Sequence, residues 1–125
     1  MVRAAFDAFN RMGDWESTLA DAAPDFEFDM SRSIAPMRGV YSLEETPKLL
    51  NELIAGFESV RIEPHEFIEL DEHVIVPLTA HMVGRDGIEV EARTTWTWKV
   101  RNGAVERVCL YQTREEALEG VGSAQ

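Results

Sequence analysis

The stretch IEVEARTTWTWKV, residues 88–100, decides the fold because apolar and polar side chains alternate along it. In a β-strand, residues i and i+2 point to the same face of the sheet. Trp96 and Trp98 are therefore predicted to share one face, which continues through Ala92 and Thr94, while the opposite face carries charged and threonine side chains. The face with the tryptophans must be covered, so they either fill a core or line a cavity.

Glycine turns flank this strand. Asp86-Gly87 precedes it and Asn102-Gly103 follows it, and both dipeptides are typical of tight β-hairpins. Alternation also predicts strands in three neighbouring segments, residues 57–70, 72–84 and 104–112. Since consecutive hairpins form an antiparallel meander, the second half of the chain is predicted to be one antiparallel sheet.

The first half of the chain reads mainly as helices. Apolar residues recur at helical spacing over residues 2–12, and again after the capping box SLEE at 42–45. Between these helices we expect a short helix, a half-buried strand and an irregular connection, over residues 15–22, 25–31 and 31–41 respectively. A second capping box, TREE at 113–116, predicts a last short helix that ends by Gly120.

This order of elements indicates a single α+β domain spanning residues 1–125. A strongly twisted antiparallel sheet wrapped around the long N-terminal helix, with the other helices added to it, forms a cone.

Composition excludes several classes of protein. The net charge is −11, from 23 acidic residues against 12 Lys plus Arg, so a nucleic-acid partner is not expected. No apolar run reaches the roughly 18 residues that a membrane span needs, and the N-terminus has no signal-peptide core. Cys109 is the single cysteine, which fits a reducing cytoplasm and leaves no internal disulfide.

The turn before residue 88 leaves two registers open. If Asp86-Gly87 is a two-residue turn, His81 lies opposite Ala92 and Thr79 opposite Thr94, on the face of the tryptophans. A three-residue loop with Gly87 in the left-handed conformation shifts the register by one residue and exchanges the faces. The side chains that then meet the tryptophans are apolar: Val76, Leu78, Ala80 and Met82.

The last hairpin raises the same question. A two-residue turn at Asn102-Gly103 places one set of side chains beside the tryptophans, namely Arg107, Cys109 and Tyr111. A bulged turn places the alternate set there, namely Val108, Leu110 and Gln112.

Three segments carry a resemblance to a known family: GVYSLEE (39–45), FESVRIEPHEFIELDEHVIV (57–76) and WTWKVRNGAVERVCLYQTREEALEGVG (96–122). Together they resemble the SnoaL-like branch of the NTF2-like superfamily, over residues 5–122. The resemblance implies an α+β cone, commonly a homodimer packed through its sheet, with a ligand cavity between sheet and helices. Family members include polyketide cyclases, ketosteroid isomerases, epoxide hydrolases, dehydratases and non-catalytic binding modules.

The resemblance also implies a choice of registers. It favours the two-residue register of the first hairpin, with His81 facing the cavity, and the bulged turn of the last one. The positions that best match the catalytic groups of ketosteroid isomerases hold Met30, Phe6 and Trp96, so that chemistry is not expected. The Asp-Arg-Asp arrangement of the epoxide hydrolases has no inward-facing match either.

His81 is consequently the candidate catalytic residue, as a general acid or base. A partly buried histidine bonded to a neighbour is the competing interpretation. His65 and His73 are predicted to be solvated, Glu27 and Asp29 to lie at the surface, and no metal or cofactor is expected. The expected cavity wall is mostly apolar: Phe6, Phe28, Met30, Leu50, Ile54, Trp96, Trp98 and Leu110, with polar groups from Thr79, Thr94 and Gln112.

Two functional hypotheses follow. One is a cofactor-independent isomerase, cyclase or dehydratase that acts on a hydrophobic cyclic substrate, with His81 as acid or base. The alternative is a non-catalytic module that binds a hydrophobic small molecule or only supports dimerisation. A homodimer is expected because an inward His81 leaves an apolar stripe outside: Val74, Val76, Leu78, Ala80 and Met82.

Overall fold

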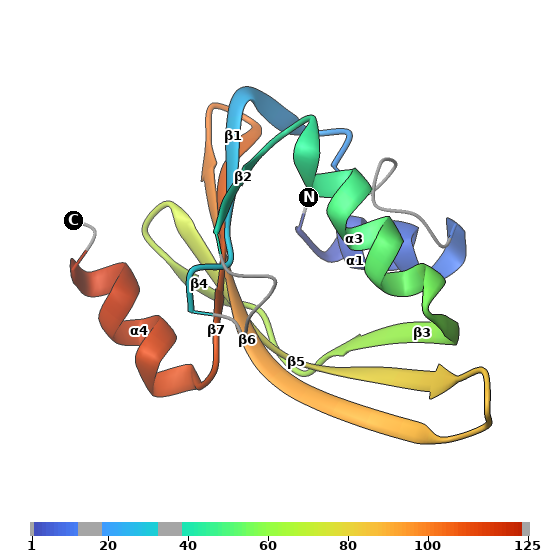
Figure 1. The fold of residues 1–125 in the computed structure, drawn as a ribbon. Helices are drawn as coiled ribbons and strands as arrows, with labels where there is room; N and C mark the ends of the chain where they lie inside the picture. The colour runs from blue at the N-terminus through green and yellow to red at the C-terminus, as the bar shows by residue number, and fades with distance from the viewer. Residues whose placement is uncertain (1, 13–18, 33–38, 124–125) are drawn as a thin grey trace.

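The computed structural model describes residues 2–12, 19–32 and 39–123 (Figure 1). In these segments the helices are α1, Val2–Met12; α3, Glu45–Ala55; and α4, Arg114–Ser123. The strands are β1, Ala22–Asp29; β2, Val40–Ser42; β3, Phe57–Pro64; β4, Ile68–Leu70; β5, His73–Gly84; β6, Glu89–Arg101; and β7, Ala104–Tyr111. None of the described helices is long and apolar enough to cross a membrane.

The strands form one curved, unclosed sheet in the order β2-β1-β7-β6-β5-β3, with β4 paired to β5 (Figure 1). Strands β5, β6 and β7 follow each other as antiparallel hairpins, as predicted. The expectation of an entirely antiparallel sheet is wrong at one place, because β1 pairs with β7 in parallel. No hairpin joins these two strands, which come from opposite ends of the chain, so nothing in the connection forces them to run in opposite directions.

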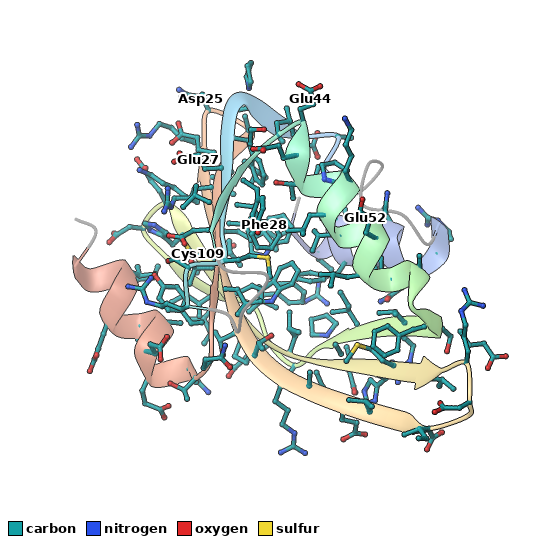
Figure 2. All side chains as sticks on the ribbon, in the orientation of Figure 1. Asp25, Glu27, Phe28, Glu44, Glu52 and Cys109 are labelled. Carbon is teal, nitrogen blue, oxygen red and sulfur yellow. The ribbon has the colours of Figure 1, made fainter. Side chains whose placement is uncertain are left out.

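The helices lie on both sides of the sheet. Figure 1 shows α1 and α3 within the curve of the sheet and α4 against its outer face. The main core lies on the concave side and includes Phe6 and Phe9 of α1 and Phe28 of β1. Alternation along β1 turns Phe28 toward the helices and Glu27 away from them (Figure 2). The α+β cone predicted from the sequence is confirmed.

A second, smaller core lies on the outer face. There Ala117 and Val121 of α4 pack against Ile75, Cys109 and Tyr111 of the sheet. The last helix therefore covers the outer face over β5 and β7 and leaves the concave side to α1 and α3.

The first capping box forms as predicted. The backbone N–H of Ser42 donates to Glu45 Oε1 at 3.0 Å, and the backbone N–H of Glu45 donates to Ser42 Oγ at 3.2 Å. Hydrogen bonds from the backbone N–H and the side chain of Ser42 hold the pKa of the Glu45 carboxyl below its ordinary value. Pro47 lies in the first turn of α3, where its missing N–H costs nothing.

Four local predictions need correction or lie outside the description. Of the short helix expected over 15–22, residues 15–18 lie outside the described segments, residues 19–21 form a turn and Ala22 already begins β1. The strand expected over 57–70 is divided into β3 and β4, because its register against β5 shifts by one residue between Pro64, opposite Leu78, and Ile68, opposite Ile75. The connection expected to be irregular ends in β2, and α4 continues past Gly120 to Ser123.

Asn10 closes one edge of the sheet. Its side-chain Nδ2 donates to Ile62 O at 2.7 Å, and its Oδ1 accepts from Ile62 N at 2.9 Å. Strand β3 is the last strand of the sheet on this side, so the amide takes the place of a neighbouring strand. Ile62 itself is buried.

We expect Asn10→Ala to lower the free energy of unfolding by about 1–3 kcal/mol, because two backbone groups of β3 lose their partner. Urea denaturation followed by far-ultraviolet circular dichroism measures the change. Asp7→Ala, one turn earlier on an exposed position of α1, is the control and should stay within about 0.5 kcal/mol of the wild type. Equal losses in both variants would show that the helix surface, rather than the bonds to Ile62, is responsible.

Candidate functional site

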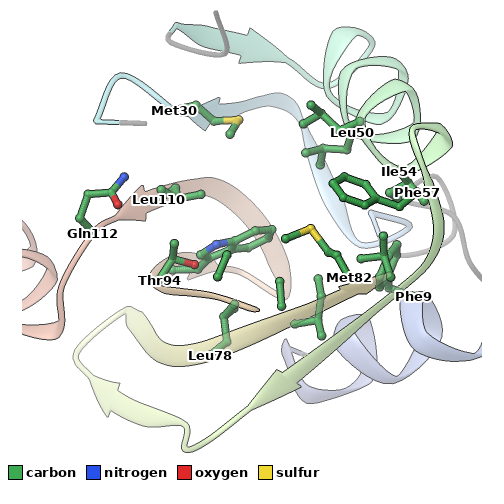
Figure 3. A pocket seen from close by; sticks show the side chains of 16 residues that line it. Phe9, Met30, Leu50, Ile54, Phe57, Leu78, Met82, Thr94, Leu110 and Gln112 are labelled. Carbon is green, nitrogen blue, oxygen red and sulfur yellow. The ribbon is translucent and has the colours of Figure 1, made fainter. Parts of the chain in front are cut away.

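A cavity of about 290 Å³ lies between the concave face of the sheet and α3 (Figure 3). Strands β3, β5, β6 and β7 supply one wall, and α1 and α3 the other. Sixteen of the described residues line it, nearly all of them apolar: Phe9, Met30, Leu50, Leu53, Ile54, Phe57, Val60, Ile62, Leu78, Ala80, Met82, Ala92, Thr94, Trp96, Leu110 and Gln112. None of these lining residues carries a charge.

Polar side chains lie at one end of the cavity. Figure 3 shows Thr94 and Gln112 together at the end opposite Phe57 and Met82. Gln112 Nε2 donates to the backbone oxygen of Arg32 at 3.0 Å, which orients the amide, since its nitrogen is fixed on that side. The arrangement is an apolar hollow with hydrogen-bonding groups at a single end.

The two tryptophans have different environments although they share a face. Trp96 lines the cavity, and its ring lies 5.4 Å from that of Phe28 between centroids. Trp98 lies outside the lining, is 1% exposed, and packs edge-on against Phe6 with 5.4 Å between ring centroids. The same face of β6 is therefore cavity wall at Trp96 and solid core at Trp98.

The first hairpin has the three-residue loop. The N–H of Gly84 bonds to Ile88 O at 2.8 Å, the N–H of Gly87 bonds to Gly84 O at 2.9 Å, and Gly87 has φ +86°. The opposed pairs are consequently Val76 with Trp96, Leu78 with Thr94, and Ala80 with Ala92. The two-residue register that the family resemblance favoured is wrong. The loop contains three residues, and Gly87, in the left-handed conformation, is the third of them.

His81 and Thr79 therefore do not lie on the cavity wall. The His81 side chain is on the outer face, 28% exposed, with Nε2 at 2.7 Å from Glu63 Oε1 and Nδ1 at 3.4 Å from Glu91 Oε1. The hydrogen bond from His81 is the main reason why the pKa of the Glu63 carboxyl is lowered. Thr79 is buried on the same outer face, and its Oγ1 lies 2.7 Å from His65 Nε2.

The stripe that motivated the homodimer also faces inward. Leu78, Ala80 and Met82 line the cavity, and Val76 is fully buried. The argument for a dimer from an exposed apolar stripe is thus wrong. A homodimer packed through the sheet stays a prediction that rests on the family resemblance alone.

The last hairpin combines the two alternatives. Asn102 and Gly103, with φ of 53° and 77°, form a two-residue turn between Arg101 and Ala104. A bulge then shifts the register, so that Lys99 pairs with Arg107 while Val100 pairs with Val105. Because of this extra residue in β7, the inward set is the one the resemblance favoured: Val108, Leu110 and Gln112.

The same bulge turns Arg107 to the outer face, where it binds two carboxylates. Its guanidinium lies 2.6 Å from Glu27 Oε1 and 2.5 Å from Asp29 Oδ2, and its Nε donates to Cys109 Sγ at 3.3 Å. Asp29 is buried, so the surface position predicted for it is wrong. His73, also predicted to be solvated, is half-buried. Its burial, and to a smaller extent the positive charge of the nearby Lys99, lowers the pKa of its imidazole.

Seven of the residues expected in the wall line this cavity: Met30, Leu50, Ile54, Thr94, Trp96, Leu110 and Gln112. Phe6, Phe28 and Trp98 lie deeper in the core, and Thr79 lies on the other face. The missed residues are all apolar: Phe9, Leu53, Phe57, Val60, Ile62, Leu78, Ala80, Met82 and Ala92. The missed residues of β5 face the cavity in the three-residue register, which the sequence had left open.

The comparisons with known proteins agree with this fold. A family model of the SnoaL-like domain matches residues 2–108. No curated protein sequence matches the chain.

Three solved structures show the same fold. An NTF2-like protein of unknown function from Burkholderia pseudomallei is 22% identical with a TM-score of 0.76, over 94% of this chain and 92% of that one. TerC, co-crystallized with polyporic acid, is 21% identical with the same TM-score and the same coverage, 94% and 92%. A putative polyketide cyclase from Xanthomonas campestris is 22% identical with a TM-score of 0.68, over 96% and 93% of the two chains.

Proposed function

Because the chain belongs to the SnoaL-like family, we propose that it binds a hydrophobic cyclic small molecule in the cavity beside Trp96. The observation that carries this proposal is the composition of the wall. An apolar hollow of about 290 Å³ with polar side chains only at the Thr94 and Gln112 end suits a compact ring system with few polar groups. Each square ångström of apolar ligand surface removed from water contributes about 25 cal/mol.

The cavity wall is better suited to binding a ligand than to transferring a proton. Its described lining residues include no Asp, Glu, His, Lys, Tyr or Cys, so none of them is an acid or base near neutral pH. In the catalytic alternative, an isomerase, cyclase or dehydratase, His81 would have to act on a ligand from the far side of the sheet. Its Nε2 is instead directed at Glu63.

The neighbouring structures favour a cyclic ligand. One was co-crystallized with polyporic acid, another is a putative polyketide cyclase, and a third is the epoxide hydrolase/cyclase-like enzyme SalBIII. Their identity to this chain is low, so they support the class of ligand and no particular compound. A cytoplasmic location stays a prediction from the single cysteine.

Filling the cavity tests the proposal. N-phenyl-1-naphthylamine is a neutral aromatic probe whose fluorescence rises in an apolar site. We expect the wild type to bind it and Ala92→Phe to weaken that binding at least tenfold, because the new ring occupies part of the cavity that Ala92 lines. A tenfold loss corresponds to about 1.4 kcal/mol.

Glu89→Phe is the matched control, since Glu89 lies on the same strand but at an exposed position on the outer face. It should leave probe binding unchanged. Circular dichroism checks that both variants are folded. If Ala92→Phe binds the probe as tightly as the wild type, the probe sits on the surface and the proposal is wrong.

A further inference from the structure

A second hollow, of about 200 Å³, adjoins the polar end of the cavity. It shares three lining residues with the cavity: Leu78, Thr94 and Gln112. The other residues that line it are His65, Pro77, Arg93, Thr95, Thr113 and Arg114. We call this hollow the annex. Because three residues belong to both walls, the two hollows adjoin along Leu78, Thr94 and Gln112, at the edge of β6 that β7 leaves uncovered.

The annex exists because β7 is shorter than β6. The last pair between the two strands is Thr95 with Tyr111, and the part of β6 from Glu89 to Thr94 has no β7 residue beside it. The chain turns away at Gln112 and enters α4 at Arg114. An opening is left at this edge, lined by Leu78 and Thr94 of the concave face and by Pro77 and Thr95 of the outer face.

The charge of the annex is opposite to that of the molecule. The whole chain carries 23 acidic residues in 125, yet the nine described residues that line the annex include no Asp or Glu. Two of them are arginines and one is a histidine. Arg114 is paired with Glu66 at 2.6 Å, and His65 is bonded to Thr79. Among the described residues, Arg93 has no ion pair.

From these contacts we infer that the ligand is an acid: a hydrophobic ring system in the cavity that bears one anionic group, held in the annex by Arg93. The inference rests on the proposed function and names the class of ligand more closely. A guanidinium presents paired N–H donors to a carboxylate, a sulfonate or an enolate. The hydroxyl of Thr94 and the amide of Gln112, at the boundary of the two hollows, bond the polar atoms that join the acid to the ring.

Two probes that differ in one anionic group test this. N-phenyl-1-naphthylamine is neutral, and 1-anilinonaphthalene-8-sulfonate adds a sulfonate to the same ring system. Fluorescence titration at low ionic strength keeps screening small. We expect the sulfonate probe to bind about fivefold more tightly than the neutral one, as a partly exposed charge-assisted hydrogen bond allows, although the net charge of −11 repels it.

Arg93→Gln should remove most of this fivefold preference and leave the neutral probe unaffected. Arg61→Gln is the matched control, because Arg61 is also exposed, lies on β3 and lines neither hollow. It changes the net charge by the same amount and should preserve the preference. An equal loss in both variants, or no loss in Arg93→Gln, would overturn the inference.

The two proposals fail in different ways. If the neutral probe binds the wild type and does not bind Ala92→Phe, the cavity binds ligands. An unchanged preference for the sulfonate probe in Arg93→Gln then overturns only the inference that the ligand is an acid. If neither probe binds, or Ala92→Phe affects neither, the proposed function fails and this inference fails with it.

Discussion

Trp98→Ala is expected to lower the free energy of unfolding by about 3–5 kcal/mol, the usual cost of deleting a buried aromatic side chain. The indole is 1% exposed and its ring packs edge-on against Phe6 at 5.4 Å, so its removal leaves a void that the surrounding core cannot close. Trp96→Ala should cost less than Trp98→Ala, because the Trp96 side chain already faces an open cavity.

Ligand binding should show the opposite order. We expect Trp96→Ala to weaken the binding of N-phenyl-1-naphthylamine at least tenfold while the protein stays folded, since one wall of the cavity is lost. Urea denaturation followed by circular dichroism gives the two stabilities, and fluorescence titration gives the affinities. Equal destabilisation by the two substitutions, with no effect of Trp96→Ala on binding, would mean that both indoles are core and that the cavity binds nothing.

The second large effect is expected on the outer face, where Arg107 binds Asp29 and Glu27. The Asp29 side chain is only 11% exposed, and Arg107→Met would leave its carboxylate with the backbone N–H of Ser31 as a donor. Breaking a buried ion pair costs about 3–5 kcal/mol. Since the Arg107 side chain is 37% exposed, we expect a loss nearer to about 2 kcal/mol.

A surface arginine provides the control. Arg101 binds Glu72 at 3.0 Å, with both side chains 48% exposed, so Arg101→Met should cost clearly less than Arg107→Met. Placing Arg107→Met in an Asp29→Asn background should recover much of the loss, because no carboxylate is left without its partner. If the two arginine substitutions cost the same, the pair with Asp29 does not stabilise the fold.

The effect of Arg107→Met should also depend on pH. Burial alone would raise the pKa of Asp29, but hydrogen bonds from Ser31 and the Arg107 guanidinium outweigh it and lower the pKa below the ordinary 3.8. A lowered pKa in the folded state stabilises the protein above the unfolded value, and this contribution is lost as the pH falls through the folded value. The difference between wild type and variant should therefore be largest near neutral pH and narrow below about pH 3.8.

The elements themselves could be predicted from the sequence because each has a local cause. The capping box at Ser42 and Glu45, the apolar spacing of α1 and the turn at Asn102-Gly103 depend on residues within one turn of each other. For the same reason the prediction that Trp96 and Trp98 share a face is correct, since the alternation of side chains along one strand does not depend on a partner strand.

What could not be predicted depends on how segments meet. The position of His81 was decided by whether the loop before β6 contains two residues or three, a difference of one hydrogen bond at Gly84. Sequence patterns do not separate these loops when Asp-Gly fits both. The annex could not be foreseen either, because it results from the unequal lengths of β6 and β7 together with the packing of Gln112 beside Thr94.

The extra residue in β7 has a consequence for how this chain can change over time. Because the register shifts between Val105 and Arg107, loss of one residue there would exchange the two faces of the rest of the strand. Val108 and Leu110 would leave the interior, and the Arg107 guanidinium and the Cys109 thiol would enter it. Point substitutions in β7 alter one side chain at a time, whereas a single-codon deletion would invert a whole wall of the cavity. A change in the length of this strand is therefore expected to disrupt the cavity more than a substitution of any one of its residues.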